Sequence, residues 1–166
     1  CVTADSAFVV RGYAAAAQAA EIELSVLVEF DTGAHRCGVQ SPAEAAELAR
    51  LIADAAGLAF GGLMTFPYNP QSDDFVRDTR ALLKPDGIEI ECVSYGGTPG
   101  MWGAHECAEV TEYRAGTYIY GDRSIIRSGA MTQDQIALTV VTTVVSRPTA
   151  TRGILDAGSK TFSSDL

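Results

Sequence analysis

The stretch Ser25 to Val39, SVLVEFDTGAHRCGV, decides the fold of this chain. It begins as an apolar run typical of a buried strand and ends in a polar turn that contains Asp31, His35 and Arg36. Parallel α/β proteins carry functional residues on loops beyond the ends of buried strands, which hold the loops in position. The stretch therefore predicts a strand that delivers polar side chains to a functional site.

Strand-like and helix-like segments alternate on both sides of this stretch, with the roughly 30-residue spacing of a βαβ unit. The clearest helix start is Ser41-Pro42 with Glu44, which combines an N-cap, a first-turn proline and a capping box. The alternation predicts an α/β fold, either a doubly wound sheet or part of a (β/α)8 barrel, which takes about 250 residues when complete. We expect strands at 1–4, 25–30, 58–64, 88–94 and 110–114, a short strand-like piece at 117–120, and helices at 7–20, 41–57 and 72–83.

The pattern changes beyond Gly129. Residues 136–147, IALTVVTTVVSR, form a long β-branched run, residues 153–156 form a second one, and no helix is expected between them. We therefore predict two domains, an α/β domain over 1–129 and the start of a β-rich domain over 130–166.

Composition and charge exclude several classes of protein. The chain has 166 residues, of which 47% are hydrophobic and 20% charged, as expected of a folded globular domain. A formal net charge of −9 argues against a nucleic-acid binder, since such proteins rely on clustered basic residues. No apolar stretch approaches the roughly 20 residues that span a bilayer. The four cysteines are scattered without a Cys-x-x-Cys pair, as in a cytoplasmic protein with reduced thiols.

Two glycine turns are candidates for binding an anion. In Gly96-Gly97-Thr98 the glycines let backbone N–H groups approach phosphate oxygens, and the threonine hydroxyl adds a donor. A plain tight turn explains the same motif equally well. The second turn follows Arg114, and two such turns make a phosphate site more credible. Arg36 fits either a ligand-binding role or a surface ion pair with Asp31.

Other residues with catalytic chemistry are less suggestive. His105 and Cys107 are of zinc-ligand type, but no second pair completes a site, so we interpret them as loop residues. Lys84 and Lys160 are the only lysines, and neither position suggests a catalytic amine.

Seven segments, in order, resemble the D-threonine aldolase and D-serine dehydratase branch of the alanine-racemase-like pyridoxal phosphate enzymes. The resemblance covers nearly the whole chain, although each segment alone has low specificity. It implies the later strands of a partial (β/α)8 barrel that run into the start of a C-terminal β domain. The segments are 28–33, 36–39, 62–65, 94–99, 114–118, 144–148 and 155–160.

The resemblance implies roles for individual residues. Arg36 matches an arginine near the phenolic oxygen of the cofactor and the substrate carboxylate, and Arg114 an arginine that faces the pyridine nitrogen in racemases. Tyr68 lies where relatives place substrate- or cofactor-facing residues, although the Phe66-Pro67-Tyr68 turn departs from the common histidine-bearing version. The residues that match the phosphate-holding turns are Gly96, Gly97, Thr98, Gly116 and Thr117.

The resemblance also implies a function. We expect a central fragment, inactive alone, of a pyridoxal-phosphate-dependent lyase that acts on D-β-hydroxy amino acids by aldol cleavage or dehydration. The aldimine-forming lysine is expected before Cys1 and the divalent-metal ligands after Leu166, so no catalytic or metal residue is assigned here. The full-length protein is expected to be a cytoplasmic homodimer. The alternatives are an amino acid racemase and a non-catalytic pyridoxal-phosphate-binding barrel, which the β-rich segment disfavours.

Overall fold

The computed structural model describes residues 1–162 of the chain. The chain divides into two compact units, Cys1–Gly116 and Thr117–Leu166. The domain boundary predicted after Gly129 rests on a change in the sequence pattern, whereas these units are defined by compactness. The predicted boundary therefore stays a prediction.

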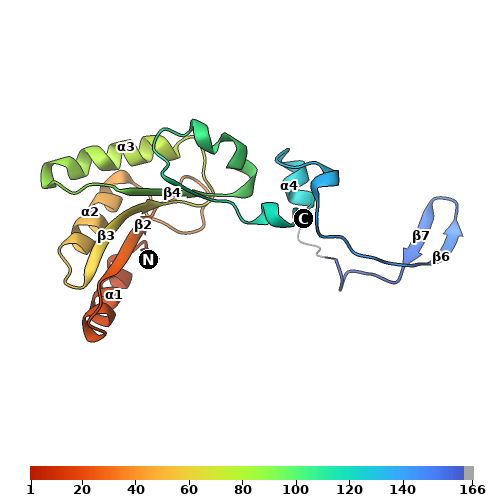
Figure 1. Ribbon diagram of the computed structural model, residues 1–166, viewed down its shortest axis with the longest axis horizontal. Coiled ribbons are helices and arrows are strands. Elements are labelled where there is room, and N and C mark those ends of the chain that lie inside the picture. Colours follow the sequence, from red (N-terminus) through yellow and green to blue (C-terminus); the bar gives the residue numbers. More distant parts are fainter. Residues whose placement is uncertain (163–166) are drawn as a thin grey trace. The chain divides into compact units, whose positions relative to one another are not determined.

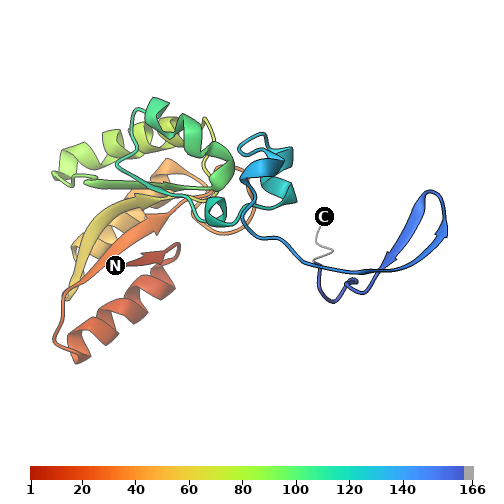
Figure 2. The ribbon, with the colours of Figure 1, turned by 45° about the vertical axis from the view of Figure 1, so that its right-hand side comes forward.

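The first unit is a parallel sheet with helices along one face (Figures 1 and 2). All four neighbouring strand pairs are parallel, and the strands lie in the sheet in the order in which they occur in the chain. A doubly wound sheet reverses its strand order at a switch point, whereas a (β/α)8 barrel adds each strand beside the last. The topology therefore favours the barrel. The elements are β1 (Val2–Ala4), α1 (Ala7–Ala19), β2 (Leu24–Glu29), α2 (Pro42–Ala53), β3 (Leu58–Met64), α3 (Ser72–Leu83), β4 (Cys92–Gly96) and β5 (Glu112–Arg114).

The core lies between the sheet and the helices. Val28 and Phe30 from the β2 segment are buried there with Ala49 and Ile52 of α2. Phe30 stacks on Phe75 of α3, with 4.3 Å between ring centres. Because side chains alternate along a strand, Glu29 faces the other side of the sheet, away from this core.

The N-terminus of α2 is built as predicted. Ser41 Oγ accepts a hydrogen bond from the Glu44 amide at 3.3 Å, and Glu44 Oε2 accepts one from the Ser41 amide at 3.0 Å. The predicted helix end at 57 was too late, since α2 ends at Ala53.

The predicted start of the fourth strand at residue 88 was wrong, because β4 begins at Cys92. The Ile88 amide donates to the Leu83 carbonyl at 3.4 Å, and the Ile90 carbonyl accepts from Arg80 at 3.2 Å. These backbone groups bond to the α3 side of the chain, so they are not available to the sheet.

The second unit differs most from expectation. Residues 117–120 were predicted as strand-like, but Thr117–Ile119 form a 3-10 helix, η3, and the Gly121 amide donates to the Thr117 carbonyl at 2.8 Å. Of the predicted strand 136–147, only the end joins an antiparallel hairpin, of β6 (Val144–Thr149) and β7 (Arg152–Leu155). A short helix, α4 (Arg123–Arg127), precedes it.

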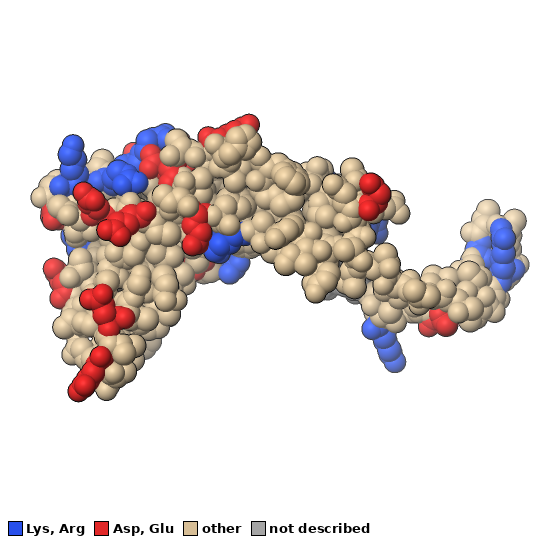
Figure 3. All heavy atoms as spheres, viewed as in Figure 1, with Lys and Arg blue, Asp and Glu red and all other residues tan. Residues whose placement is uncertain are grey.

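Charge is dispersed over the surface. On the face shown in Figure 3, acidic and basic side chains are interspersed over the first unit, and no continuous basic surface forms on that face. Among residues 1–162, none of the helices has the length and apolar character that a membrane crossing requires.

Candidate functional site

The turn after β2 is held rigidly by Asp31. Its carboxylate accepts backbone hydrogen bonds from Gly33 at 2.9 Å, Ala34 at 2.8 Å and His35 at 3.0 Å. Gly38 closes the turn with φ of +111°, and an added Cβ there would lie 2.5 Å from the Phe30 carbonyl carbon. The turn therefore presents Arg36 from a fixed backbone.

Burial of Asp31 acts to raise its pKa, but the hydrogen bonds from Ala34, Gly33 and His35 outweigh it and hold the pKa below its ordinary value. The carboxylate therefore stabilises the fold above the unfolded-state pKa of about 3.9 and loses this contribution as pH falls through the lower folded-state pKa. Asp31→Asn is expected to lower the Tm at pH 7, with a difference from wild type that shrinks below about pH 4. Thermal unfolding between pH 7 and pH 3 checks this, and a Tm difference independent of pH would contradict it.

Arg36 contacts an aromatic ring. Its guanidinium carbon lies 4.9 Å from the ring centre of Phe66, within the range of a cation–π interaction. Among the described residues Arg36 makes no ion pair with Asp31, whose carboxylate accepts backbone N–H groups of its own turn. The surface ion pair considered from the sequence is therefore not formed.

Arg114 at the end of β5 reaches the same region. Its Nε donates to Ser94 Oγ at 2.8 Å, and its Nη2 donates to the Thr65 carbonyl at 2.9 Å. A Cβ added to Gly96 would lie 3.2 Å from Arg114 Nη2 and 3.1 Å from the Phe66 ring. Glycine at 96 thus lets the guanidinium and the ring approach the β4 backbone closely.

The structure therefore brings together four residues from four chain segments. Arg36 lies over Phe66, the Phe66 ring lies beside Gly96, and Gly96 lies against Arg114. Two cationic side chains converge on one strand-end region, which is an arrangement suited to an anionic ligand.

The glycine turn after β4 continues this region. The Tyr68 amide donates to the Gly96 carbonyl at 2.9 Å, and the Gly97 amide donates to the Arg114 carbonyl at 3.3 Å. Gly97 has φ of +121°, which favours glycine. Thr98 is only 3% exposed, yet its Oγ1 has no hydrogen-bond partner among residues 1–162. An orphaned buried hydroxyl next to a glycine turn fits a phosphate ligand.

Tyr68 contributes its backbone to this region, and its ring packs among other tyrosines. The ring stacks on Tyr95, with centres 5.0 Å apart, and meets Tyr113 edge-on at 6.4 Å. A hydrogen bond with Cys107, followed by burial, raises the pKa of Tyr68 to about 12. The hydroxyl is thus protonated at neutral pH, and the predicted role of Tyr68 stays a prediction.

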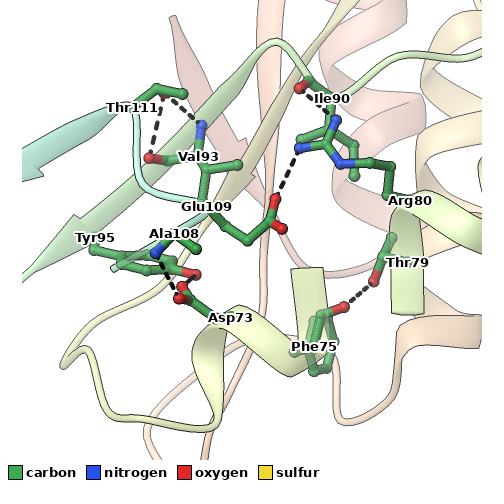
Figure 4. Close-up of polar contacts among 10 residues, drawn as sticks. All are labelled: Asp73, Phe75, Thr79, Arg80, Ile90, Val93, Tyr95, Ala108, Glu109 and Thr111. Atoms are coloured by element: carbon green, nitrogen blue, oxygen red, sulfur yellow. Dashed lines mark hydrogen bonds and ion pairs between the residues drawn. The ribbon is translucent and has the colours of Figure 1, made fainter. Parts of the chain in front are cut away.

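A polar network supports the segment that connects β4 to β5 (Figure 4). Asp73 of α3 accepts hydrogen bonds from the Tyr95 hydroxyl and the Ala108 amide, both at 2.8 Å. Arg80, also on α3, pairs with Glu109 at 3.1 Å. These contacts fix the segment between the two strands that carry Ser94 and Arg114.

Gly116, Thr117, His105 and Cys107 are the remaining residues that the sequence singled out. Gly116 is the last residue of the first unit and Thr117 the first of the second, in η3. Their phosphate role stays a prediction. His105 is exposed and Cys107 buried, and residues 1–162 contain no group of three or more His, Cys, Asp or Glu that could hold a metal.

Sequence reasoning missed the contacts of Ser94 and Phe66 with the two arginines. Ser94 lies between Val93 and Tyr95, whose side chains are fully buried. A serine between two buried apolar residues of a strand indicates a polar opposite face, and that signal could have found it.

Comparison with known proteins places the chain in a family. Residues 1–124 match the profile of the alanine racemase N-terminal domain, and residues 137–166 match that of a putative serine dehydratase domain. The chain belongs to the alanine racemase N-terminal domain family.

Similar proteins come from several bacteria. A 3-hydroxy-D-aspartate aldolase of Paracoccus denitrificans is 30% identical over 91% of this chain and 44% of its own length. A D-threo-3-hydroxyaspartate dehydratase of a Delftia species is 31% identical over 84% of this chain and 41% of its own. The crystal structure of D-threonine aldolase from Filomicrobium marinum matches with a TM-score of 0.80 at 28% identity, over 95% of this chain and 47% of that one. The chain spans less than half the length of each of these proteins.

Proposed function

We propose that the full-length protein is a pyridoxal-phosphate-dependent lyase that acts on D-β-hydroxy amino acids, by aldol cleavage or by dehydration. One observation carries the cofactor part of the proposal: Arg36 and Arg114 converge on Phe66 and Gly96, next to the unpartnered Thr98 hydroxyl. The names of the similar proteins, aldolases and a dehydratase of hydroxy-D-amino acids, support the reaction class.

The phosphate group would be held at the glycine turns. Thr98 donates its free hydroxyl, and glycine at 96 and 97 keeps the backbone open to close approach. We also assign a phosphate role to Gly116 and Thr117, because they match the phosphate-holding turns of the family that the sequence resembles. When bound, pyridoxal phosphate withdraws electron density from the substrate Cα and so weakens the bonds at that carbon.

The two arginines have different tasks. Arg36 binds the substrate carboxylate, for which a guanidinium supplies a planar pair of donors. Arg114 faces the pyridine nitrogen and, being permanently charged, disfavours protonation there. The pyridine ring of a bound cofactor would then withdraw electrons less strongly. A reaction that breaks a bond at Cβ would therefore need additional catalysis at the β-hydroxyl.

A divalent metal at the β-hydroxyl would supply that help. The described residues do not fit such a site, since residues 1–162 gather no set of three potential ligands. We therefore assign no residue of this chain to the metal and derive no step from it. We further propose that the substrate is a small D-amino acid and that the full-length protein is a cytoplasmic homodimer. The four free cysteines are consistent with the cytoplasmic location.

Product analysis on the full-length protein tests this function. With pyridoxal phosphate and a divalent metal, D-threonine is expected to release glycine and an aldehyde, or D-serine to release ammonia, and a chelator is expected to abolish the release. Racemisation of either substrate without these products would contradict the lyase and favour the racemase.

A further inference from the structure

Arg114 is fixed by partners that occupy only part of its guanidinium. Nε donates to Ser94 Oγ at 2.8 Å, and Nη2 donates to the carbonyls of Thr65 at 2.9 Å and Ser94 at 3.4 Å. Within residues 1–162, Nη1 has no hydrogen bond, so this end remains available to a ligand. The orientation of the free end depends on the fixed end.

The direction of each hydrogen bond in this group follows from its chemistry. A guanidinium can only donate, so Ser94 Oγ accepts from Arg114 and must place its single proton elsewhere. It donates that proton to Oε1 of Glu112. Glu112 therefore fixes the rotation of the Ser94 hydroxyl, whose lone pair is then aimed at Arg114.

The sheet register makes this arrangement possible. Ser94 pairs with Glu112 and Gly96 pairs with Arg114 between the parallel strands β4 and β5. The alternation along each strand puts all four positions on one face of the sheet. Ser94 is fully buried, whereas the Glu112 side chain is 55% exposed.

The direct attraction between Glu112 and Arg114 is weak. Glu112 Oε1 lies 3.9 Å from Arg114 Nε, and both side chains are more than a third exposed, so water screens the pair. Glu112 therefore acts on Arg114 by orienting the Ser94 hydroxyl, and not by charge pairing.

We propose that Ser94 and Glu112 are positioning residues that hold the Arg114 guanidinium against Gly96 and direct its free end into the cofactor site. The hydrogen-bonded placement stands on the geometry alone, while its effect on the cofactor rests on the proposed function. Ser94 acts as the acceptor that fixes Nε, and Glu112 acts through Ser94.

Hydrogen exchange of the Arg114 Nε–H, measured by NMR on full-length protein with 15N-labelled arginine, tests the placement without cofactor. Arg114→Lys identifies the signal. Ser94→Ala and Glu112→Ala are each expected to speed exchange about tenfold or more, the loss expected for one charged hydrogen bond. Glu112→Gln keeps an acceptor for Ser94 and is expected to stay within about threefold of wild type. Glu91→Gln, at an exposed glutamate just before β4, removes the same charge and serves as the matched control.

Two results would overturn the placement. One is unchanged exchange in Glu112→Ala, a readout that survives if the buried Ser94→Ala variant does not fold. The other is equal exchange in Glu112→Gln and Glu112→Ala, which would mean that charge and not the hydrogen bond holds Arg114.

The absorbance spectrum of bound pyridoxal phosphate tests the proposed effect of Ser94 and Glu112 on the cofactor. Ser94→Ala and Glu112→Ala are expected to shift it in the direction of Arg114→Lys. A spectrum that changes in Arg114→Lys but not in these two variants would overturn their role toward the cofactor. If the wild-type protein binds no pyridoxal phosphate while hydrogen exchange in the variants changes as expected, the proposed function is refuted. The placement of Arg114 by Ser94 and Glu112 remains supported in that case.

Discussion

Arg36→Ala in the full-length protein is expected to lower kcat/KM for a D-β-hydroxy amino acid by roughly 300-fold. The variant removes the guanidinium proposed to bind the substrate carboxylate, and truncation of one partner of a hydrogen-bonded charge pair costs about 2–5 kcal/mol. At about 1.4 kcal/mol per factor of ten, the middle of that range gives the stated loss. Steady-state kinetics with D-threonine or D-serine measures it.

Two variants make this result specific to Arg36. Arg36→Lys keeps the charge but loses the planar pair of donors, so it is expected to recover only part of the activity. Arg11→Ala removes an exposed arginine from α1 and is expected to retain wild-type kinetics. An Arg36→Ala enzyme with wild-type kcat/KM would remove Arg36 from the site.

Gly62→Ala is expected to have the largest effect on stability. Gly62 in β3 has φ of +132°, and an added Cβ would overlap the Cys92 carbonyl oxygen and lie 2.8 Å from the Cys92 carbonyl carbon. This neighbour is backbone in the adjacent strand β4, so it cannot move without breaking the sheet. A loss of more than about 4 kcal/mol, or failure to fold, is expected.

The matched substitution is Gly12→Ala in helix α1. None of the described residues has an atom within 4 Å of the added Cβ there, and alanine favours a helix over glycine by about 1 kcal/mol. Thermal or denaturant unfolding should therefore show Gly12→Ala at or above wild-type stability and Gly62→Ala far below it. A Gly62→Ala protein as stable as wild type would show that the β3–β4 approach is not as close as described.

The elements of the first unit could be predicted because local signals and burial agree there. Ser41, Pro42 and Glu44 specify the start of α2, and the apolar run 58–64 coincides with β3. Strand type does not by itself give sheet order, so the pattern alone left a barrel and a doubly wound sheet open. The resemblance favoured the barrel, and the sequential parallel pairing agrees with it.

The second unit shows where local propensity fails. β-Branched residues favour strands only where a partner strand supplies hydrogen bonds. Among residues 136–143 of the predicted strand, the Ala137 amide bonds to the Tyr120 carbonyl at 2.8 Å and not to a partner strand. No local pattern signals that choice, because the partner lies 17 residues away in sequence.

The candidate site could be predicted only in part. The polar turn with Arg36 and the glycine turn with Thr98 are recognisable as sequence motifs. The role of Arg114 was predicted from the resemblance to the alanine-racemase-like enzymes. The contact of Arg36 with Phe66, and the hydrogen bonds of Ser94 with Arg114 and Glu112, join residues from different segments of the chain. Such contacts depend on register, which the sequence specifies only through the whole fold.

A crystal structure of the full-length protein with pyridoxal phosphate tests the central claim most directly. We expect the phosphate at the turn after β4, with Thr98 Oγ1 at a hydrogen-bond distance of about 2.7 Å from a phosphate oxygen, and the ring nitrogen facing Arg114. A cofactor bound with its phosphate away from Thr98 and its ring away from both Arg36 and Arg114 would contradict it.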